Sequence, residues 1–207
     1  MKITKFEHAC FMVTKDDQTL VVDPGNWSSD FRTPSNVVAV IITHEHEDHF
    51  DQSKLQQIAE QNPTAVVIAD ESITSQVTVL PTKSVAAGET QTVGPFTLTF
   101  YGGEHAIIYD GYPKVTNLGV LINNTLYYPG DSFALPEKPI DTLALPVSAP
   151  WMKISDAMIF CKEVNPRLVF PTHDAILSDS GKALVDRLLG GVSNQYQRLV
   201  EPIEIDG

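Results

Sequence analysis

The sequence has 207 residues, 43% of them hydrophobic and 19% charged, which is the composition of a globular protein large enough for a full core. Its formal net charge of −12 argues against nucleic acid as a partner, because a nucleic-acid-binding surface needs basic side chains over the phosphates. The sequence contains no apolar run near the roughly 18 residues that a membrane span needs.

Residues 1–8 and the two cysteines bear on the location of the protein. Residues 1–8 lack the continuous apolar core and the cleavage site of a signal peptide, which predicts a cytoplasmic protein. Cys10 and Cys161 are too few and too far apart for a disulfide framework, so we expect two buried thiols. We expect a single domain over residues 1–207, and the sequence leaves open whether it forms a homo-oligomer.

Short strands dominate the predicted elements. In chain order, strands are predicted over residues 3–6, 10–14, 19–22, 37–42, 65–69, 96–100, 118–122, 125–128, 140–145 and 167–170, with hairpin turns at 15–18 and 123–124. One helix is predicted in the first half, over 53–61 with Asp51 as its N-cap. Two are predicted in the second half, around 154–161 and over 181–189 with Ser180 as its cap. Two sheets packed face to face, with helices outside, fit this order best.

A cluster of histidines directly follows the predicted strand over residues 37–42. His44, His46 and His49 lie within six residues of one another, together with Asp48. Neutral imidazole is the commonest protein ligand for zinc-like metals, and a carboxylate is a good second partner. The cluster therefore predicts a metal site, and its number of ligands favours two metals.

Three more polar residues follow predicted strands in the same way. They are His105, His173 and Asp131, and Asp131 comes after Gly130, which allows the tight turn that brings a carboxylate close to an ion. Their order along the chain is His-x-His-x-Asp-His at 44–49, then a lone histidine, then Gly-Asp-Ser at 130–132, then a late histidine. This order resembles the metal-binding pattern of the metallo-β-lactamase superfamily.

The segments 6–13 and 20–24 resemble one branch of that superfamily. The branch holds compact hydrolases similar to L-ascorbate-6-phosphate lactonase and to the phospholipase D that acts on N-acyl phosphatidylethanolamines. The resemblance spans residues 3–175 and implies the metallo-β-lactamase fold, a four-layer αββα sandwich of the α/β (α+β) class.

The resemblance also implies a role for each motif residue. Asp48 is expected to bind metal and to orient the attacking hydroxide as the catalytic residue. Asp23 is expected to support the ligand histidines from behind, and His8 to contact substrate or a ligand rather than metal. The implied ligands are His44, His46 and His105 for the first metal, Asp48, His49 and His173 for the second, and Asp131 between them.

The expected function is that of a metal-dependent hydrolase, which uses a metal-bridging hydroxide on a small phosphoester, lactone or related ester. The cofactors are two divalent ions, Zn²⁺ first, with Mn²⁺, Fe²⁺ or Ni²⁺ left open. The partner is a small molecule, and loops 27–36, 107–117 and 133–138 are expected to select it. Trp151 is expected to pack under its loop, with a place in the cleft as the alternative. A non-catalytic metal-binding or scaffold protein and a nuclease-type phosphodiesterase remain alternatives.

Overall fold

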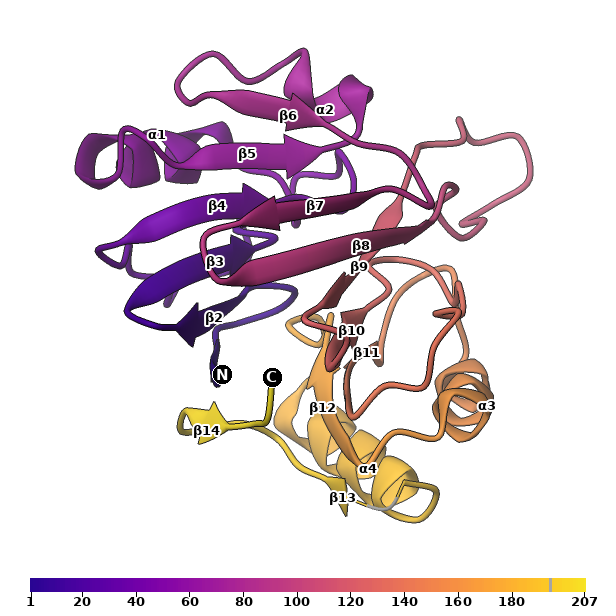
Figure 1. The fold of residues 1–207 in the computed structure, drawn as a ribbon. Helices are drawn as coiled ribbons and strands as arrows, with labels where there is room; N and C mark the ends of the chain where they lie inside the picture. Colours follow the sequence, from indigo (N-terminus) through magenta and orange to yellow (C-terminus); the bar gives the residue numbers. More distant parts are fainter. Residues whose placement is uncertain (194) are drawn as a thin grey trace.

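The protein, described by a computed structural model over residues 1–193 and 195–207, contains two seven-stranded sheets (Figure 1). The first has the order β14-β1-β2-β3-β4-β5-β6, with bounds Ile203–Glu204, Lys2–Lys5, Phe11–Lys15, Gln18–Val22, Val37–Ile41, Val66–Ala69 and Thr82–Ser84. The second has the order β13-β12-β11-β10-β9-β8-β7, with bounds Gln195–Tyr196, Leu168–Thr172, Thr142–Pro146, Leu126–Tyr128, Leu118–Ile122, Phe96–Gly102 and Thr90–Val93. The helices are α1 (Gln52–Gln61), α2 (Glu71–Thr74), α3 (Ile154–Val164) and α4 (Asp179–Gly190).

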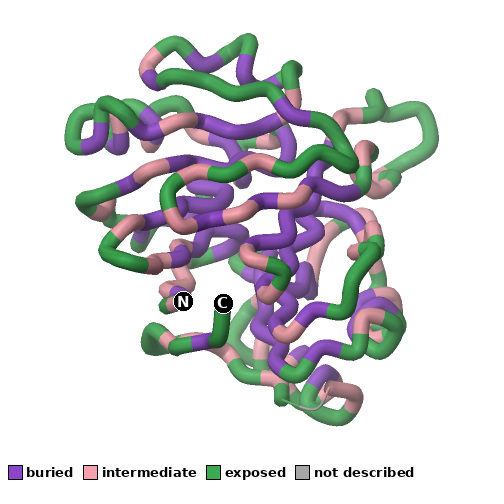
Figure 2. Tube along the Cα trace, in the orientation of Figure 1, coloured by how far each residue is buried: buried purple, intermediate pink, exposed green. Residues whose placement is uncertain are grey.

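Alternation along the strands separates three apolar layers. In β3, Leu20 and Val22 face the other sheet, and Val21 between them faces α1. One core lies between the sheets, a second between the first sheet and α1 and α2, and a third between the second sheet and α3 and α4. Figure 2 shows buried segments along the central strands and exposed ones at the loops, and the edge strands β6 and β7 are also largely exposed or half-buried. The predicted four-layer αββα sandwich is confirmed.

Local signals account for several element boundaries. The turn between β2 and β3 places Asp16 and Asp17 at φ values of 48° and 59°, a conformation in which short polar residues are tolerated and which suits a two-residue hairpin. Asn123 and Asn124 do the same between β9 and β10. The carboxylate of Asp51 accepts a hydrogen bond from the backbone of Ser53 and caps α1, as predicted.

Two predictions about helices were wrong. The cap of α4 is Ser178, whose backbone is extended and whose hydroxyl accepts a hydrogen bond from Gly181 N, whereas Ser180 lies inside the first turn. The first half of the chain also contains a second helix, the single turn α2, which Asp70 caps through Ser72 N. Four residues are too few for a recognisable apolar period, which explains why the pattern did not indicate α2.

The two ends of the described chain lie together at the edge of the first sheet (Figure 1). Strand β14 pairs with β1 in antiparallel register, with Ile3 opposite Ile203. The thiols of Cys10 and Cys161 are free and buried, as predicted. Within the described residues, no helix is long and apolar enough to cross a membrane.

Candidate metal centre

The candidate site lies at one edge of the sandwich, where loops from both sheets meet. In the first sheet, residues 44–49 follow β4. In the second sheet, His105, Asp131 and His173 follow β8, β10 and β12. Strands β10, β11 and β12 run parallel, so their carboxyl ends lie at the same edge. The topology therefore gathers side chains that are up to about 130 residues apart in the sequence.

Two glycines let the backbone close around this edge. A Cβ atom at Gly25 would lie 1.9 Å from the carbonyl carbon of Asp48. A Cβ atom at Gly130, where φ is 64°, would lie 2.4 Å from Asn117 Oδ1. That oxygen accepts a hydrogen bond from the backbone N–H of Asp131 at 2.9 Å. Only glycine allows both close approaches, and the second of them positions the Asp131 carboxylate.

The predicted ligands form overlapping groups whose donor atoms lie within 4.8 Å of one another. One group coincides with the three residues expected at the first metal. Another contains the three expected at the second metal and adds His8. In full, the groups are His44, His46 and His105; His8, Asp48, His49 and His173; and His44, His49 and Asp131.

Asp131 lies between the two sets of histidines. Its Oδ2 is 3.4 Å from His105 Nε2 and 3.0 Å from His173 Nε2, and its Oδ1 is 3.3 Å from His49 Nε2. Asp48 has a more one-sided position, with its Oδ2 3.3 Å from His173 Nε2. The carboxylate expected to bridge two metals is therefore the one that contacts histidines of both sets.

Four of the histidines are held by their Nδ1 atoms, each against an oxygen. The partners are Thr43 Oγ1 for His44 (3.1 Å), Asp23 Oδ2 for His49 (2.7 Å), the Ala106 carbonyl for His105 (2.5 Å) and the Ser148 carbonyl for His173 (2.6 Å). Carbonyl and carboxylate oxygens only accept, so we assign the proton to Nδ1 in each ring. Each Nε2 atom is then free to offer its lone pair to the centre of the site.

Asp23 lies behind the cluster and is fully buried. Its Oδ1 accepts from Thr43 N at 2.8 Å, and its Oδ2 accepts from Thr43 Oγ1 at 2.6 Å and from His49 Nδ1 at 2.7 Å. Because the Thr43 hydroxyl donates its proton to Asp23, its lone pair is available to His44 Nδ1. One carboxylate thus orients two histidines of the cluster, one directly and one through Thr43.

In His8 the roles of the two ring nitrogens are reversed relative to the four histidines above. Its Nδ1 accepts a hydrogen bond from the backbone N–H of Ala175 at 3.3 Å, so the proton of the neutral ring lies on Nε2. That atom is 2.9 Å from Asp48 Oδ2 and donates to it. The His8 carbonyl also accepts from His173 N at 3.1 Å. His8 therefore contacts both Asp48 and His173, but the lone pair of its Nε2 is not available to a metal.

Three of these residues have strained backbones. His8, Asp23 and His173 have φ values of 57°, 45° and 57°, in the left-handed region that side chains other than glycine rarely adopt. Such conformations cost about 1–3 kcal/mol each and persist only where the surroundings fix them. The other described non-glycine residues with positive φ are aspartates and asparagines, so the two histidines of the cluster are the unusual cases.

The donor set fits divalent metal ions. Among the described buried side chains, six polar atoms make no hydrogen bond, and four of those atoms belong to this cluster. An unpaired buried polar atom costs about 1–3 kcal/mol, so a concentration of them indicates a missing partner. With the histidine rings in the neutral form that metal binding requires, all four of these atoms are acceptors and point to a cation: His44 Nε2, His49 Nε2, His105 Nε2 and Asp131 Oδ1.

Burial and the carboxylates of Asp131 and Asp23 determine which histidines are protonated when no metal is bound. Burial holds the pKa of His44 well below its ordinary value. Burial would also lower the pKa of His173, but the carboxylate of Asp131 outweighs it and raises that pKa to about 9. For His49, burial is likewise outweighed by Asp131 and Asp23, and its pKa lies well above the ordinary value. Without metal, His49 and His173 therefore carry protons that metal ions would replace.

Trp151 belongs to the site, although we expected it to pack under its loop. Its indole N–H donates to Asp131 Oδ2 at 2.8 Å, and its ring packs against Phe133. It is half-buried and lines a cavity together with Asp48 and His173. Thr43 and Asn117 also support the site, and no role was predicted for either of them.

The Asn117 side-chain amide bonds to the backbone of Pro129 and Asp131 and so holds the turn at Gly130. An asparagine next to a strand was the only sequence signal that could have indicated this role.

The fold and this cluster define the class: a metallo-β-lactamase fold with a histidine and aspartate cluster able to bind metal at the edge of its sheets. Residues 2–173 match the model of the β-lactamase superfamily domain, and the chain belongs to that family. It is 32% identical to protein Rv0786c of Mycobacterium tuberculosis over 97% of each chain.

Two further proteins extend this similarity. A UPF0173 metal-dependent hydrolase of Carboxydothermus hydrogenoformans is 27% identical over 84% of each chain. The structure of Igni18, a metallo hydrolase of Ignicoccus hospitalis, covers 99% of each chain with a TM-score of 0.75 at 19% identity, and it supports the fold.

Proposed function

We propose that this protein is a binuclear metal-dependent hydrolase that cleaves a small phosphoester, lactone or related ester. One observation carries the proposal: the unpaired Nε2 atoms and the unpaired Asp131 oxygen meet at one buried centre. The relative from Carboxydothermus hydrogenoformans, whose name gives a metal-dependent hydrolase, supports the same activity. Zn²⁺ suits imidazole and carboxylate ligands, and Mn²⁺, Fe²⁺ and Ni²⁺ are the alternatives.

We assign the ligands as the sequence pattern predicts. The first ion is bound by His44, His46 and His105, and the second by Asp48, His49 and His173. Asp131 contributes to both, which its contacts with histidines of both sets support.

In the proposed mechanism, two bound divalent ions supply a water molecule of lowered pKa and polarise the scissile group. Asp48 lines the cavity, and its carboxylate would orient this water. The indole N–H of Trp151 holds Asp131 Oδ2 in place. Nδ1–H donation to fixed acceptors keeps the ligand rings from rotating during turnover.

His8 and Asp23 act as positioning residues in this proposal. The Nε2–H of His8 donates to Asp48 Oδ2 and fixes the direction of that carboxylate. Asp23 fixes the tautomers of His44 and His49, as described above. Neither residue is assigned as a ligand. For His8 the reason is the backbone N–H of Ala175, which occupies the Nδ1 lone pair.

The proposal also includes the domain organisation, the location, the partner and the family branch expected from the sequence. A single domain over residues 1–207 is supported by β13 and β14, which add strands of the carboxyl-terminal segment to both sheets. The cytoplasmic location, the small-molecule partner and the likeness to the lactonase and phospholipase D branch also remain part of this proposal. Nuclease-type activity is disfavoured by the net charge of −12.

The test is metal content together with hydrolysis. Tag-free protein purified without chelator should contain about two metal ions per chain by elemental analysis. Asp131→Ala should lose metal, whereas Glu45→Gln, an exposed neighbour of the ligands, should keep it. The metal-loaded protein should hydrolyse members of a panel of simple lactones, p-nitrophenyl esters and bis-(p-nitrophenyl) phosphate. Two bound metals without turnover of any member would favour the non-catalytic alternative, and an unchanged metal content in Asp131→Ala would contradict the ligand assignment.

A further inference from the structure

Two cavities, each of about 300 Å³, meet at the candidate metal centre. The metal cavity is lined by Asp48, Asp131 and His173 together with Trp27 and Trp151. The loop cavity is lined by residues 105–115, together with Glu45 and His46. The two cavities share His46, His105 and Ile108. A ligand whose reacting atom lies at the metals can therefore extend into the loop cavity without leaving the protein surface.

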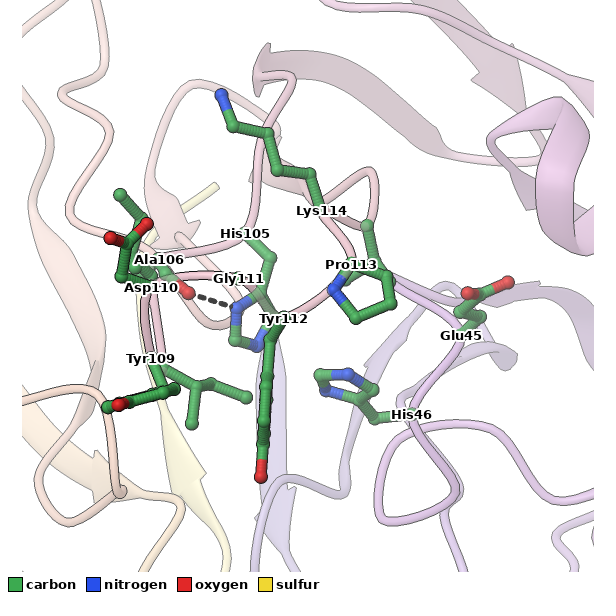
Figure 3. Close-up of a pocket in the computed structure, with 13 residues that line it drawn as sticks. Glu45, His46, His105, Ala106, Tyr109, Asp110, Gly111, Tyr112, Pro113 and Lys114 are labelled. Atoms are coloured by element: carbon green, nitrogen blue, oxygen red, sulfur yellow. Dashed lines mark hydrogen bonds between the residues drawn. The ribbon is translucent and has the colours of Figure 1, made fainter.

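Apolar side chains make up much of the wall of the loop cavity. They belong to Ile107, Ile108, Tyr109, Tyr112 and Pro113. Figure 3 shows Tyr112 and Pro113 beside His46 and His105, the two ligand candidates that this cavity reaches.

Exposed apolar side chains gather around these cavities. Among the described residues, nine large hydrophobic side chains are exposed, and five of them line one cavity or the other. Tyr112 is 63% exposed and Ile107 is 70% exposed in the loop cavity. Trp27 and Ile176 stand at the metal cavity with 42% and 49% exposure. Concentration of exposed apolar surface at one place indicates a binding site, whereas scattered single residues would not.

The charges around the cavities disfavour an anionic ligand. Lys114 is the only basic residue that lines either cavity in the described chain, and its ammonium pairs with Glu104 at 3.1 Å. Acidic side chains line both, including Glu45, Glu47 and Asp110. Sites that bind phosphate monoesters normally present arginine, lysine or a set of backbone N–H groups to the oxygens. Apart from the metal centre itself, the one lysine or arginine that the described part of these cavities offers a phosphate group is Lys114, and it is already paired with Glu104.

We propose that the substrate is a small, uncharged carboxylic ester or lactone with an apolar arm, and that the arm lies in the loop cavity against Tyr112 and Ile108. The inference rests on the proposed function and narrows it, because it sets phosphoesters aside. A volume of about 300 Å³ per cavity is at the lower end of small-molecule sites, so the arm is short, of the size of a pentyl chain or a phenyl ring. The acidic rim lowers the local concentration of anionic competitors.

The experiment compares p-nitrophenyl substrates that differ in the length of the arm or in the scissile group and its charge. The metal-loaded protein is assayed with p-nitrophenyl hexanoate, p-nitrophenyl acetate and p-nitrophenyl phosphate. We expect the hexanoate to have a kcat/KM at least about tenfold above the acetate, since burial of only two of its four additional methylene groups, at about 0.8 kcal/mol each, gives that ratio. We expect the phosphate to be the poorest of the three. Equal values for the two esters, or a faster phosphate, would overturn the inference.

Variants of Tyr112 test whether the apolar arm of the substrate binds in the loop cavity. Tyr112→Ala should reduce the hexanoate preference to within about threefold, and Tyr112→Phe, which keeps the ring, should retain it. Ile159→Ala is the matched control, because this isoleucine is 63% exposed on α3 and lines neither cavity. An unchanged preference in Tyr112→Ala would show that the arm lies elsewhere and would overturn the assignment to the loop cavity.

A binding measurement separates this inference from the proposed function. Calorimetry of the metal-loaded protein with hexanohydroxamate, acetohydroxamate and phenylphosphonate needs no turnover, because each probe carries a metal-binding head. Tighter binding of hexanohydroxamate, lost in Tyr112→Ala, supports the apolar arm even if no ester is hydrolysed, in which case only the hydrolase proposal fails. Tightest binding by phenylphosphonate overturns the inference even if hydrolysis is observed.

Discussion

The metal-ligand cluster and the loop over it, residues 103–117, are held in place in opposite ways. The cluster residues follow strand ends, are largely buried, and have their Nδ1 atoms bound to fixed oxygens. The loop contains neither helix nor strand, and its apolar side chains at 107, 109 and 112 are 63–70% exposed. His105 is the single residue that belongs to both regions.

This difference assigns separate tasks to the two regions. Chemistry that needs ligand positions fixed to a fraction of an ångström is placed on the rigid sheet edge. We propose that selection of the substrate falls to the loop, whose side chains can change without disturbing the sheets. Substitutions in the cluster should therefore change metal binding and kcat, and substitutions of the exposed loop side chains at 107, 109 and 112 should change substrate preference alone.

The largest effect is expected from pH acting on the cluster. In the metal-free protein the pKa of His173 is raised to about 9 and that of His49 lies well above its ordinary value, so both rings are protonated at pH 7. Metal must displace these protons, so the apparent affinity should rise with pH, by about tenfold per pH unit for each proton displaced, until the pH passes about 9. Calorimetry in buffers of different ionisation enthalpy measures the protons released. Binding without proton release between pH 6 and 8 would contradict the ion pairs described for the cluster.

The next effect tests the support behind the cluster. Asp23→Asn keeps the side-chain size but removes the charge that fixes His49 and Thr43. We expect metal affinity to fall by about 10–100-fold, as is usual when a carboxylate behind a ligand histidine is lost. Competition with a chromophoric chelator gives the affinity. Asp17→Asn, in the turn between β2 and β3, is the control and should bind metal normally.

A smaller effect is expected from substitutions of His8. They test whether His8 acts by positioning Asp48 or only by packing. His8→Ala should lower kcat by about tenfold while KM stays within about twofold, because Asp48 loses its donor but the cavities keep their walls. His8→Gln should recover most of the loss, since its amide can donate to Asp48. Steady-state kinetics on one ester suffice. If glutamine restored the unfolding midpoint but not kcat, the hydrogen bond to Asp48 would have no part in turnover.

The smallest effect is expected in the loop. Tyr109→Ser should change the free energy of unfolding by no more than about 0.5 kcal/mol and leave the metal content unchanged, because Tyr109 is 69% exposed. Thermal unfolding followed by circular dichroism measures the first quantity. A large loss of stability or of metal would show that the loop supports the cluster and would break the comparison between the two regions.

The parts of the fold that a local pattern could predict were those with a local cause. Asp51 caps α1 through Ser53, two residues further along the chain and the predicted start of the helix, and the Asp16-Asp17 turn fixes the hairpin around it. Strand β14 has two residues and exists because it pairs with β1, about 200 residues away, so nothing in its own sequence indicated it. Ser178 and Ser180 have equal cap chemistry, and only the backbone geometry distinguishes them.

In the candidate site, too, features with a local cause in the sequence could be predicted, and contacts between distant segments could not. Histidine spacing and family order predicted the seven proposed ligands, which the structure brings together in the groups described. The contacts of His8 with Asp48 and of Trp151 with Asp131 join residues from unrelated loops. The tautomer of His8 depends on the backbone N–H of Ala175, which no sequence pattern connects with it. Spacing can indicate ligands, but it cannot indicate which atom of a neighbouring histidine carries the proton.

One measurement tests the central claim most directly: an anomalous-scattering difference map from crystals of the zinc-loaded protein. We predict two peaks in each molecule. The first should lie about 2.0–2.1 Å from the Nε2 atoms of His44, His46 and His105, and the second should be bound by Asp48, His49 and His173, with Asp131 between the two. A single peak, or a peak bound by Nε2 of His8, would contradict the account.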